Sequence, residues 1–272
     1  VRMVAENVLI DVQENALNGI LGTAQVTAVF NMLNLGEEIE GMAVRFPLST
    51  NDGFSRYPEI EDLPIKVNDS PVSTRRVTEL DEYDYPLPWA EFEAEFLPGE
   101  EVVIEVNYTL TGVGEYPYTS FAYLLETGAG WQGTIGRADL TVRLPYEANE
   151  YNVFIDSSPG WGQTTAGAVL AGREVRWHYE DLEPEVKHNL SIALVLPDAW
   201  SKVLKERSNV EIDPSDGEAW GRLGKLYKEI SRLRRSTRDD DGGQQLFLLS
   251  AAAYEQALEL LPDDALWHAG YA

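Results

Sequence analysis

The sequence predicts a mainly β protein: an antiparallel β-sandwich, or two small sandwiches joined near residues 112–118, followed by a small α-helical extension. Residues 1–197 alternate between apolar and polar side chains almost throughout, which is the period of strands with one buried face. Beyond that point the apolar positions recur with the period of a helix. We therefore expect an acidic β-sandwich domain over residues 1–197 and a helical segment over residues 198–272.

The strands are predicted from runs such as residues 91–97, where Phe92, Ala94 and Phe96 alternate with glutamates. Pro98 and Gly99 follow as a turn, and the alternation resumes over residues 102–110, so this stretch predicts a β-hairpin. Further turns are expected at residues 68–71 and 171–172. Strands at this spacing, without helices between them, are typical of a sandwich.

The helical part carries a repeat-like spacing. Residues 220–227 match W-x-x-L-G-x-x-Y, and a later helix supplies an aromatic residue, a small residue and a closing proline. This pattern resembles a tetratricopeptide repeat, whose positions here are Trp220, Leu223, Gly224, Tyr227, Tyr254, Ala257 and Pro262. The resemblance implies a stack of helical hairpins that docks a partner protein or packs on a neighbouring domain. A helical tail that only seals one end of the sandwich is the alternative.

The spacing departs from that family in one place. Tyr227 and Tyr254 lie about twice as far apart as in the repeat, so we expect an insertion around residues 232–245. Within it, residues 238–243 read RDDDGG, but three consecutive aspartates do not have the alternate spacing of a calcium loop. We therefore expect a solvated insertion loop there and no metal site.

Gly128, Gly130 and Gly133 form a G-x-G-x-x-G pattern. A nucleotide-binding loop needs a helix directly after the glycines, whereas residues 137–144 alternate and predict a strand. We therefore expect a loop that presents or packs Trp131, and no nucleotide. Residues 123–145 also resemble β-rich domains of unknown function in bacterial surface proteins, which implies an exported protein.

The net charge of −25 comes mostly from the β-rich part and opposes binding to nucleic acid or to anionic membrane surfaces. The absence of cysteine excludes disulfides, thiolate zinc sites and a cysteine nucleophile. No apolar stretch approaches the roughly 20 residues that span a bilayer. The chain ends inside a predicted helix, so we expect it to be a piece of a longer protein that meets a membrane only through flanking segments.

Five aromatic residues at predicted turns are the candidate ligand-facing side chains: Trp89, Tyr116, Tyr118, Trp131 and Trp161. Aromatic faces at the ends of a sandwich stack on sugar rings or seat a partner chain. The alternative is that they close the open ends of the hydrophobic core.

No catalytic, cofactor or metal site is predicted. The histidines at positions 178, 188 and 268 are scattered along the chain. Acid pairs such as Glu91 and Glu93, or the acids at positions 81, 82 and 84, carry no weight in so acidic a sequence.

We expect a non-enzymatic binding or interaction protein at the cell surface or outside the cell, with helical repeats for protein contacts. A carbohydrate-binding module or glycan-active protein that uses the loop tryptophans is one alternative. A structural domain of a larger membrane-anchored protein is the other, and a cytoplasmic location is the alternative to export.

Overall fold

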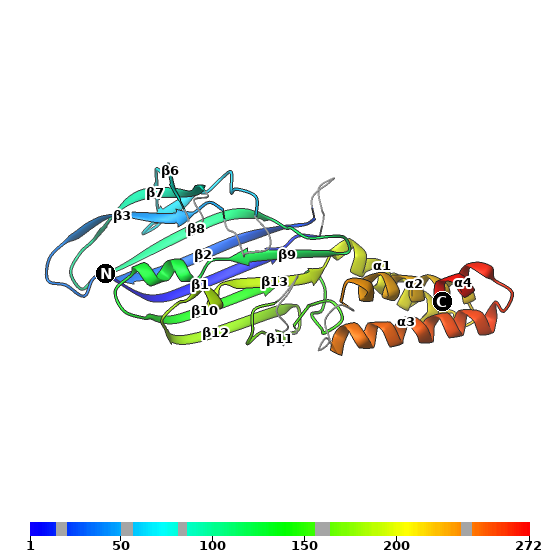
Figure 1. Ribbon diagram of the computed structural model, residues 1–272. Helices are drawn as coiled ribbons and strands as arrows, with labels where there is room; N and C mark the ends of the chain where they lie inside the picture. Colours follow the sequence, from blue (N-terminus) through cyan, green and yellow to red (C-terminus); the bar gives the residue numbers. More distant parts are fainter. Residues whose placement is uncertain (15–20, 50–56, 81–85, 156–163, 235–240) are drawn as a thin grey trace.

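The computed structural model describes residues 1–14, 21–49, 57–80, 86–155, 164–234 and 241–272. Sheets form one end of an elongated molecule and helices form the other, with the two termini at opposite ends (Figure 1). The prediction of a mainly β chain with a helical C-terminal part is confirmed. The change from strand to helix falls at Leu196, between the last strand and the first helix. The division into two separate domains stays a prediction.

Within the described residues the strands form one large sheet and two small ones. The eight-stranded sheet has the order β11 (Val169–Ala171), β12 (Glu174–Leu182), β10 (Ile135–Arg143), β1 (Arg2–Val12), β2 (Thr23–Leu33), β8 (Glu101–Thr111), β4 (Ile65–Val67), β5 (Ser70–Val72). The three-stranded sheet has the order β3 (Glu40–Pro47), β7 (Pro86–Phe96), β6 (Arg75–Leu80), and the two-stranded sheet pairs β13 (Leu190–Val195) with β9 (Tyr118–Tyr123).

The large sheet is mixed, which corrects the expectation of purely antiparallel strands. β1 and β10 run parallel, with Glu6 opposite Ala138. This pair also joins strands that precede residues 112–118 to strands that follow them. The alternative of two small sandwiches joined at that point is therefore wrong.

Both small sheets contact the same face of the large sheet. Phe46 of β3 packs edge-on against Phe30 of β2 and Tyr108 of β8, with ring centroids 6.4 and 5.5 Å apart. Tyr123 of β9 reaches Glu6 of β1. The other face of the large sheet is polar. This arrangement explains the alternation, since each strand buries one face; the sandwich assignment itself stays a prediction.

The expected hairpin around Pro98 and Gly99 is wrong. β7 pairs with β3 and β6, whereas β8 pairs with β2 and β4, so the turn connects two sheets. Both strands turn their apolar side chains to a shared core, and alternation shows which face is buried, not which strand is the neighbour. The other two turns are confirmed: Asn68 and Asp69 adopt φ values of 48° and 63° between β4 and β5, and Gly172 adopts 62° between β11 and β12.

Four helices follow in the described residues: α1 (Pro197–Ile212), α2 (Gly217–Arg234), α3 (Asp241–Leu260) and α4 (Ala265–Tyr271). Residues 232–234 continue α2 and residues 241–245 begin α3, where we expected an insertion loop. The described residues of the expected insertion therefore lengthen the two helices. Residues 238–240 of the RDDDGG run lie outside the described residues, and residues 241–243 are the first residues of α3. No helix that the structure describes combines the length and the apolar character needed to cross a membrane.

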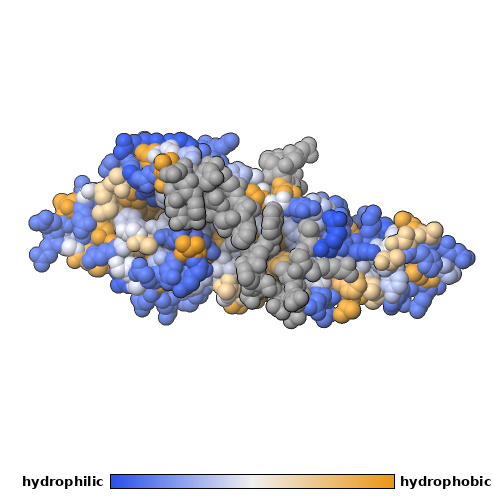
Figure 2. All heavy atoms as spheres, in the orientation of Figure 1, coloured by the Kyte–Doolittle hydropathy of each residue, from blue (hydrophilic) through white to orange (hydrophobic). Residues whose placement is uncertain are grey.

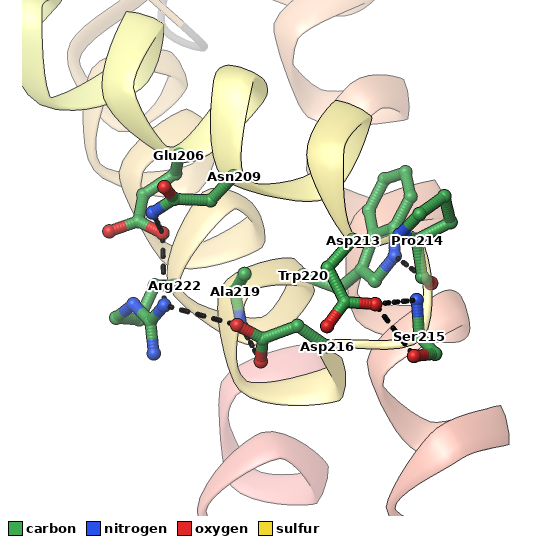
Figure 3. Close-up of polar contacts among 9 residues, drawn as sticks. All are labelled: Glu206, Asn209, Asp213, Pro214, Ser215, Asp216, Ala219, Trp220 and Arg222. Atoms are coloured by element: carbon green, nitrogen blue, oxygen red, sulfur yellow. Dashed lines mark hydrogen bonds and ion pairs between the residues drawn. The ribbon is translucent and has the colours of Figure 1, made fainter.

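The junction of α1 and α2 is built by local polar contacts (Figure 3). Asp216 accepts a hydrogen bond from the Ala219 amide at 2.9 Å, which caps the start of α2. The Trp220 indole donates to the Pro214 carbonyl at 3.0 Å. Arg222 pairs with Glu206 of α1 at 3.1 Å and so ties the two helices together. α2 accordingly begins at Gly217, directly after this polar turn.

The helices pack directly on the end of the sheets. Trp200 of α1 is only 1% exposed and lies beside the Tyr146 ring, with centroids 6.2 Å apart. The Tyr118 hydroxyl donates to the Ile230 carbonyl of α2 at 2.7 Å. One hydrophobic core consequently runs from the sheets into α1, α2 and α3.

Candidate functional site

A cavity of about 40 Å³ lies between the large sheet and the three-stranded sheet, partly open to solvent. Strands β1, β2, β3, β7 and β8 supply its walls, and the short 3₁₀ helix η1 (Glu126–Gly130) with Trp131 adds the rest. Most of the lining is apolar and includes the rings of Phe30, Phe46, Phe92 and Trp131. Glu6 is the acidic residue in this lining.

Glu6 faces inward because of the pattern of β1. It lies in phase with Val8, Ile10 and Val12, all of which are buried. A register irregularity between Met3 and Ala5 keeps the preceding residues on the buried face as well. The strand therefore places a carboxyl group where an apolar side chain would complete the series.

The Glu6 carboxyl is held by a single tyrosine among the residues that the structure describes. The Tyr123 hydroxyl donates to Glu6 Oε1 at 2.6 Å, and Glu6 is 2% exposed. Burial raises the pKa of Glu6 to about 7, an effect that the Tyr123 hydrogen bond partly offsets. At neutral pH this carboxyl group therefore exchanges between its protonated and its ionised form.

A second cavity of about 30 Å³ adjoins the same group. Tyr108 and Tyr123 line it together with residues of β3 and of the segment that follows β3. Phe46 belongs to the linings of both cavities, which places its ring between them. Burial and the charge of Glu6 both raise the pKa of Tyr108 and of Tyr123, so both hydroxyls stay protonated and available as donors.

Trp131, which lies within the glycine pattern, packs against the core at the larger of the two cavities. It is half-buried, lines the larger cavity and packs edge-on against Phe96, with centroids 6.1 Å apart. Gly128 is needed there because a Cβ atom would lie 2.8 Å from Ile135 Cδ1. Gly128 and Gly130 lie in the 3₁₀ helix η1, and Gly133 beyond it adopts a φ of 70°. Strand β10 then follows, as expected.

The other candidate aromatic residues lie elsewhere. Trp89 is inside β7 and not at a turn, because the prolines around it begin a strand. At roughly 3.3 Å per residue, it lies about 23 Å along β7 from Phe96, which contacts Trp131. Tyr118 begins β9 and is buried against α2, again not a turn position.

Tyr116 is exposed, and its hydroxyl accepts a hydrogen bond from Lys202 of α1 at 3.2 Å. Trp161 lies outside the described residues. The four described aromatic side chains thus do not form one surface, and carbohydrate binding through them stays a prediction.

The repeat-like residues mostly meet at the contact of α2, α3 and α4. A Cβ atom on Gly224 would lie 3.0 Å from the Tyr254 ring, so the missing side chain lets the two helices approach. The Tyr254 ring lies 6.4 Å from that of Trp267. Leu223, Tyr227 and Ala257 are buried, Trp220 is half-buried and Pro262 is an exposed turn residue. These contacts fit a helical hairpin; membership of the tetratricopeptide family stays a prediction.

The histidines stay apart in the structure. His178 pairs with Asp139 on the large sheet at 2.7 Å, and this contact raises the pKa of His178. His188 accepts a hydrogen bond from the Glu185 amide, and His268 lies 2.8 Å from the Pro262 carbonyl. No group of three metal-ligating side chains occurs among the described residues.

The acid pair of β7 is built differently from a catalytic pair. Glu91 is 2% exposed and is clamped by Arg45, at 2.7 Å, and by Arg75. The Arg45 and Arg75 guanidinium groups hold the pKa of Glu91 below its usual range. Glu93 is exposed two residues further on. The acids at positions 81, 82 and 84 lie outside the described residues.

No protein-family model matches the chain, and a search of curated proteins finds no relative. Among solved structures, the chain is similar to a "putative nutrient binding protein" from Legionella pneumophila subsp. pneumophila, with a TM-score of 0.56 and 18% identity. The match covers 93% of this chain and 94% of that one. At this identity the likeness shows a shared fold.

Two further structures are more distant. An M1 zinc metallopeptidase from Deinococcus radiodurans matches with a TM-score of 0.34 and 11% identity, over 71% of this chain and 42% of that one. The native yeast LTA4 hydrolase matches with a TM-score of 0.34 and 8% identity, over 71% of this chain and 28% of that one. These values carry no argument about activity.

Proposed function

We propose that this chain is a non-enzymatic binding protein that takes up a small ligand in the cavity beside Glu6. The observation that carries the proposal is an inward-facing, 2% exposed carboxyl group in an otherwise largely apolar cavity that is partly open to solvent. Ligand sites in proteins typically combine an apolar lining with a few placed polar groups. The full-length likeness to a protein described as nutrient-binding supports the same function.

Export to the cell surface is part of this proposal. Its support is the resemblance of residues 123–145 to domains of bacterial surface proteins.

The proposal is tested by thermal unfolding with a panel of sugars, amino acids, amines, carboxylates and nucleosides. A ligand present at 100 times its Kd adds about 2.7 kcal/mol of stability, which raises the Tm by about 5 to 10 °C. Val44→Phe fills the cavity from β3, whereas Ala43→Phe places the same ring on the exposed side of that strand. We expect a ligand that stabilises the wild type and Ala43→Phe but not Val44→Phe.

A ligand that stabilises folded Val44→Phe as much as the wild type would place binding elsewhere. A panel without any stabilising member would overturn the proposal.

Contacts with a protein through the helical segment are the second part of the proposal. Figure 2 shows hydrophobic side chains among polar ones on the surface of the helical end, and Leu266 and Tyr271 of α4 are 65% and 44% exposed. Exposed apolar groups of this kind mark interaction surfaces. We expect Leu266→Asp to abolish capture of a partner that the wild-type protein retains. Equal capture by both proteins would contradict this part.

A further inference from the structure

We propose that the cavity beside Glu6 binds the ammonium group of a small organic amine. This inference rests on the proposed ligand-binding function and names the chemical class of the ligand. The cavity has the two features that favour an organic cation: several aromatic rings, and an acidic side chain that pairs with no cation among the described residues.

The acidic side chain is Glu6, which forms no ion pair within the part of the chain that the structure describes. Arg45 also contributes to the lining, but its guanidinium group is bonded to Glu79 and Glu91 on the outer side of the three-stranded sheet. The neutral hydroxyl of Tyr123 donates a hydrogen bond to one of the two carboxyl oxygens of Glu6. An ammonium group would supply the missing charge and further hydrogen-bond donors.

The aromatic rings are those of Phe30, Phe46, Phe92 and Trp131, which line the same cavity. A cation near aromatic rings is attracted by their quadrupoles, and the attraction grows when water is excluded. The strongly acidic composition of the β-rich part adds a field that draws cations toward it.

The size of the cavity favours a slender group. A cavity needs about 10 to 15 Å³ of volume to hold one water. The volume of about 40 Å³ therefore corresponds to roughly three water-sized groups. That suits an ammonium group with one or two methylenes, and a longer chain can extend through the open side. A sugar ring, which has more non-hydrogen atoms, would require the walls to move apart.

The ionisation of Glu6 makes amine binding depend on pH. The groups that face Glu6 are Tyr123 of β9 and Tyr108 of β8, and both stay protonated. Arg45 of β3 is always charged, but its guanidinium group is held by Glu79 and Glu91 on the outer side of its sheet. The remaining titration is that of Glu6, whose pKa is about 7. An ammonium group prefers the ionised carboxylate, so a proton competes with it below pH 7. Affinity should fall about tenfold from pH 8 to pH 6.

The test is a calorimetric titration of the intact chain with butylammonium and with 1-butanol, a neutral molecule of the same length. An alkylammonium stays charged at both pH 8 and pH 6. We expect butylammonium to bind at least tenfold more tightly than 1-butanol at pH 8, and about tenfold less tightly at pH 6. Glu6→Gln should lower its affinity at least tenfold and remove the pH dependence. Glu93→Gln removes an exposed carboxyl group and serves as the matched control.

The outcomes separate the two proposals. Equal affinity for butylammonium and 1-butanol, or unchanged binding by Glu6→Gln, overturns the amine inference. If butylammonium does not bind but another panel member is blocked by Val44→Phe, the cavity remains a ligand site and only the amine inference fails. Because the pH dependence is measured on the wild type, the test holds even if Glu6→Gln does not fold.

Discussion

Replacing Glu6 by glutamine is the most direct test of how the buried carboxyl group behaves. Glutamine has the shape of the protonated acid, and its carbonyl oxygen can accept the hydrogen bond that Tyr123 donates to Glu6 at 2.6 Å. The variant thus keeps the packing of the cavity and removes only the titration. Any difference in stability that changes with pH therefore comes from the ionisation of Glu6.

The magnitude follows from the raised pKa. Glu6 titrates at about 7 in the folded protein and at 4.5 in the unfolded chain. At pH values well below 4.5, Glu6 is protonated in both states, so its ionisation does not affect the free energy of unfolding. As the pH rises toward 7 the unfolded chain loses the proton first, so the folded state loses about 1.4 kcal/mol of stability per unit of pH. Between pH 5 and pH 8 the free energy of unfolding should shift by about 2.5 kcal/mol in favour of Glu6→Gln.

The assay is urea unfolding followed by circular dichroism at pH 5 and pH 8, for the wild type and Glu6→Gln. Other carboxyl groups titrate equally in both proteins, so the difference between the two isolates Glu6. The same difference in free energy of unfolding at both pH values would refute the reasoning. A shift in favour of the wild type at pH 8 would show that the ionised carboxylate is stabilised in the fold.

Three other substitutions test the remaining parts of the fold. Gly221→Ala should lower the Tm, since its Cβ would lie 2.3 Å from the Trp267 ring and displace α4; a Tm that is unchanged or raised by the better helix propensity of alanine would contradict this packing. Tyr118→Phe should cost about 1 kcal/mol in urea unfolding through loss of the hydrogen bond to Ile230, and no loss would mean that the bond contributes nothing to the contact between sheet and helix. Glu91→Gln should lower the free energy of unfolding at pH 7, because Arg45 and Arg75 stabilise the ionised form of Glu91 and so lower its pKa. This loss of stability relative to the wild type should shrink as the pH falls below 4.5 and Glu91 becomes protonated. A loss of stability independent of pH would speak against the ion pairs.

The sequence was sufficient to predict strands and helices but not the pairing of strands. Alternation identified β7 and β8 as strands, yet the turn at Gly99 suggested a hairpin that does not exist. The parallel pair of β1 and β10 joins positions such as Glu6 and Ala138, which lie far apart in the sequence. Periodicity reports the environment of each strand and carries no information about its partner. Local signals such as those for the turns at residues 68–71 and 171–172 were reliable because they depend on residues close in sequence.

The candidate aromatic residues show that a local pattern does not reveal which residues meet at the candidate site either. Proximity to prolines placed Trp89 and Tyr118 at turns, but both lie in strands. The prolines before Trp89 are among the first residues of β7, where proline is tolerated, whereas Tyr118 itself begins β9 directly after a proline. Trp131 was singled out from its glycine loop, and it does line a cavity. The rest of the cavity lining comes mainly from β1, β2, β3, β7 and β8. These strands are spread along the sequence, so no local pattern predicts that they meet.

Glu6 was the functional candidate that the sequence analysis missed, although a signal for it was present. In β1 it occupies the same phase as Val8, Ile10 and Val12, so alternation alone assigns it to the buried face. In a chain with 46 acidic residues a single glutamate draws no attention by its type. Its phase is the informative property, because burying a carboxyl group without a cation costs several kcal/mol and a strand with only a structural role would place an apolar residue there. A glutamate in phase with a run of buried side chains is thus a stronger functional signal than any number of exposed acids.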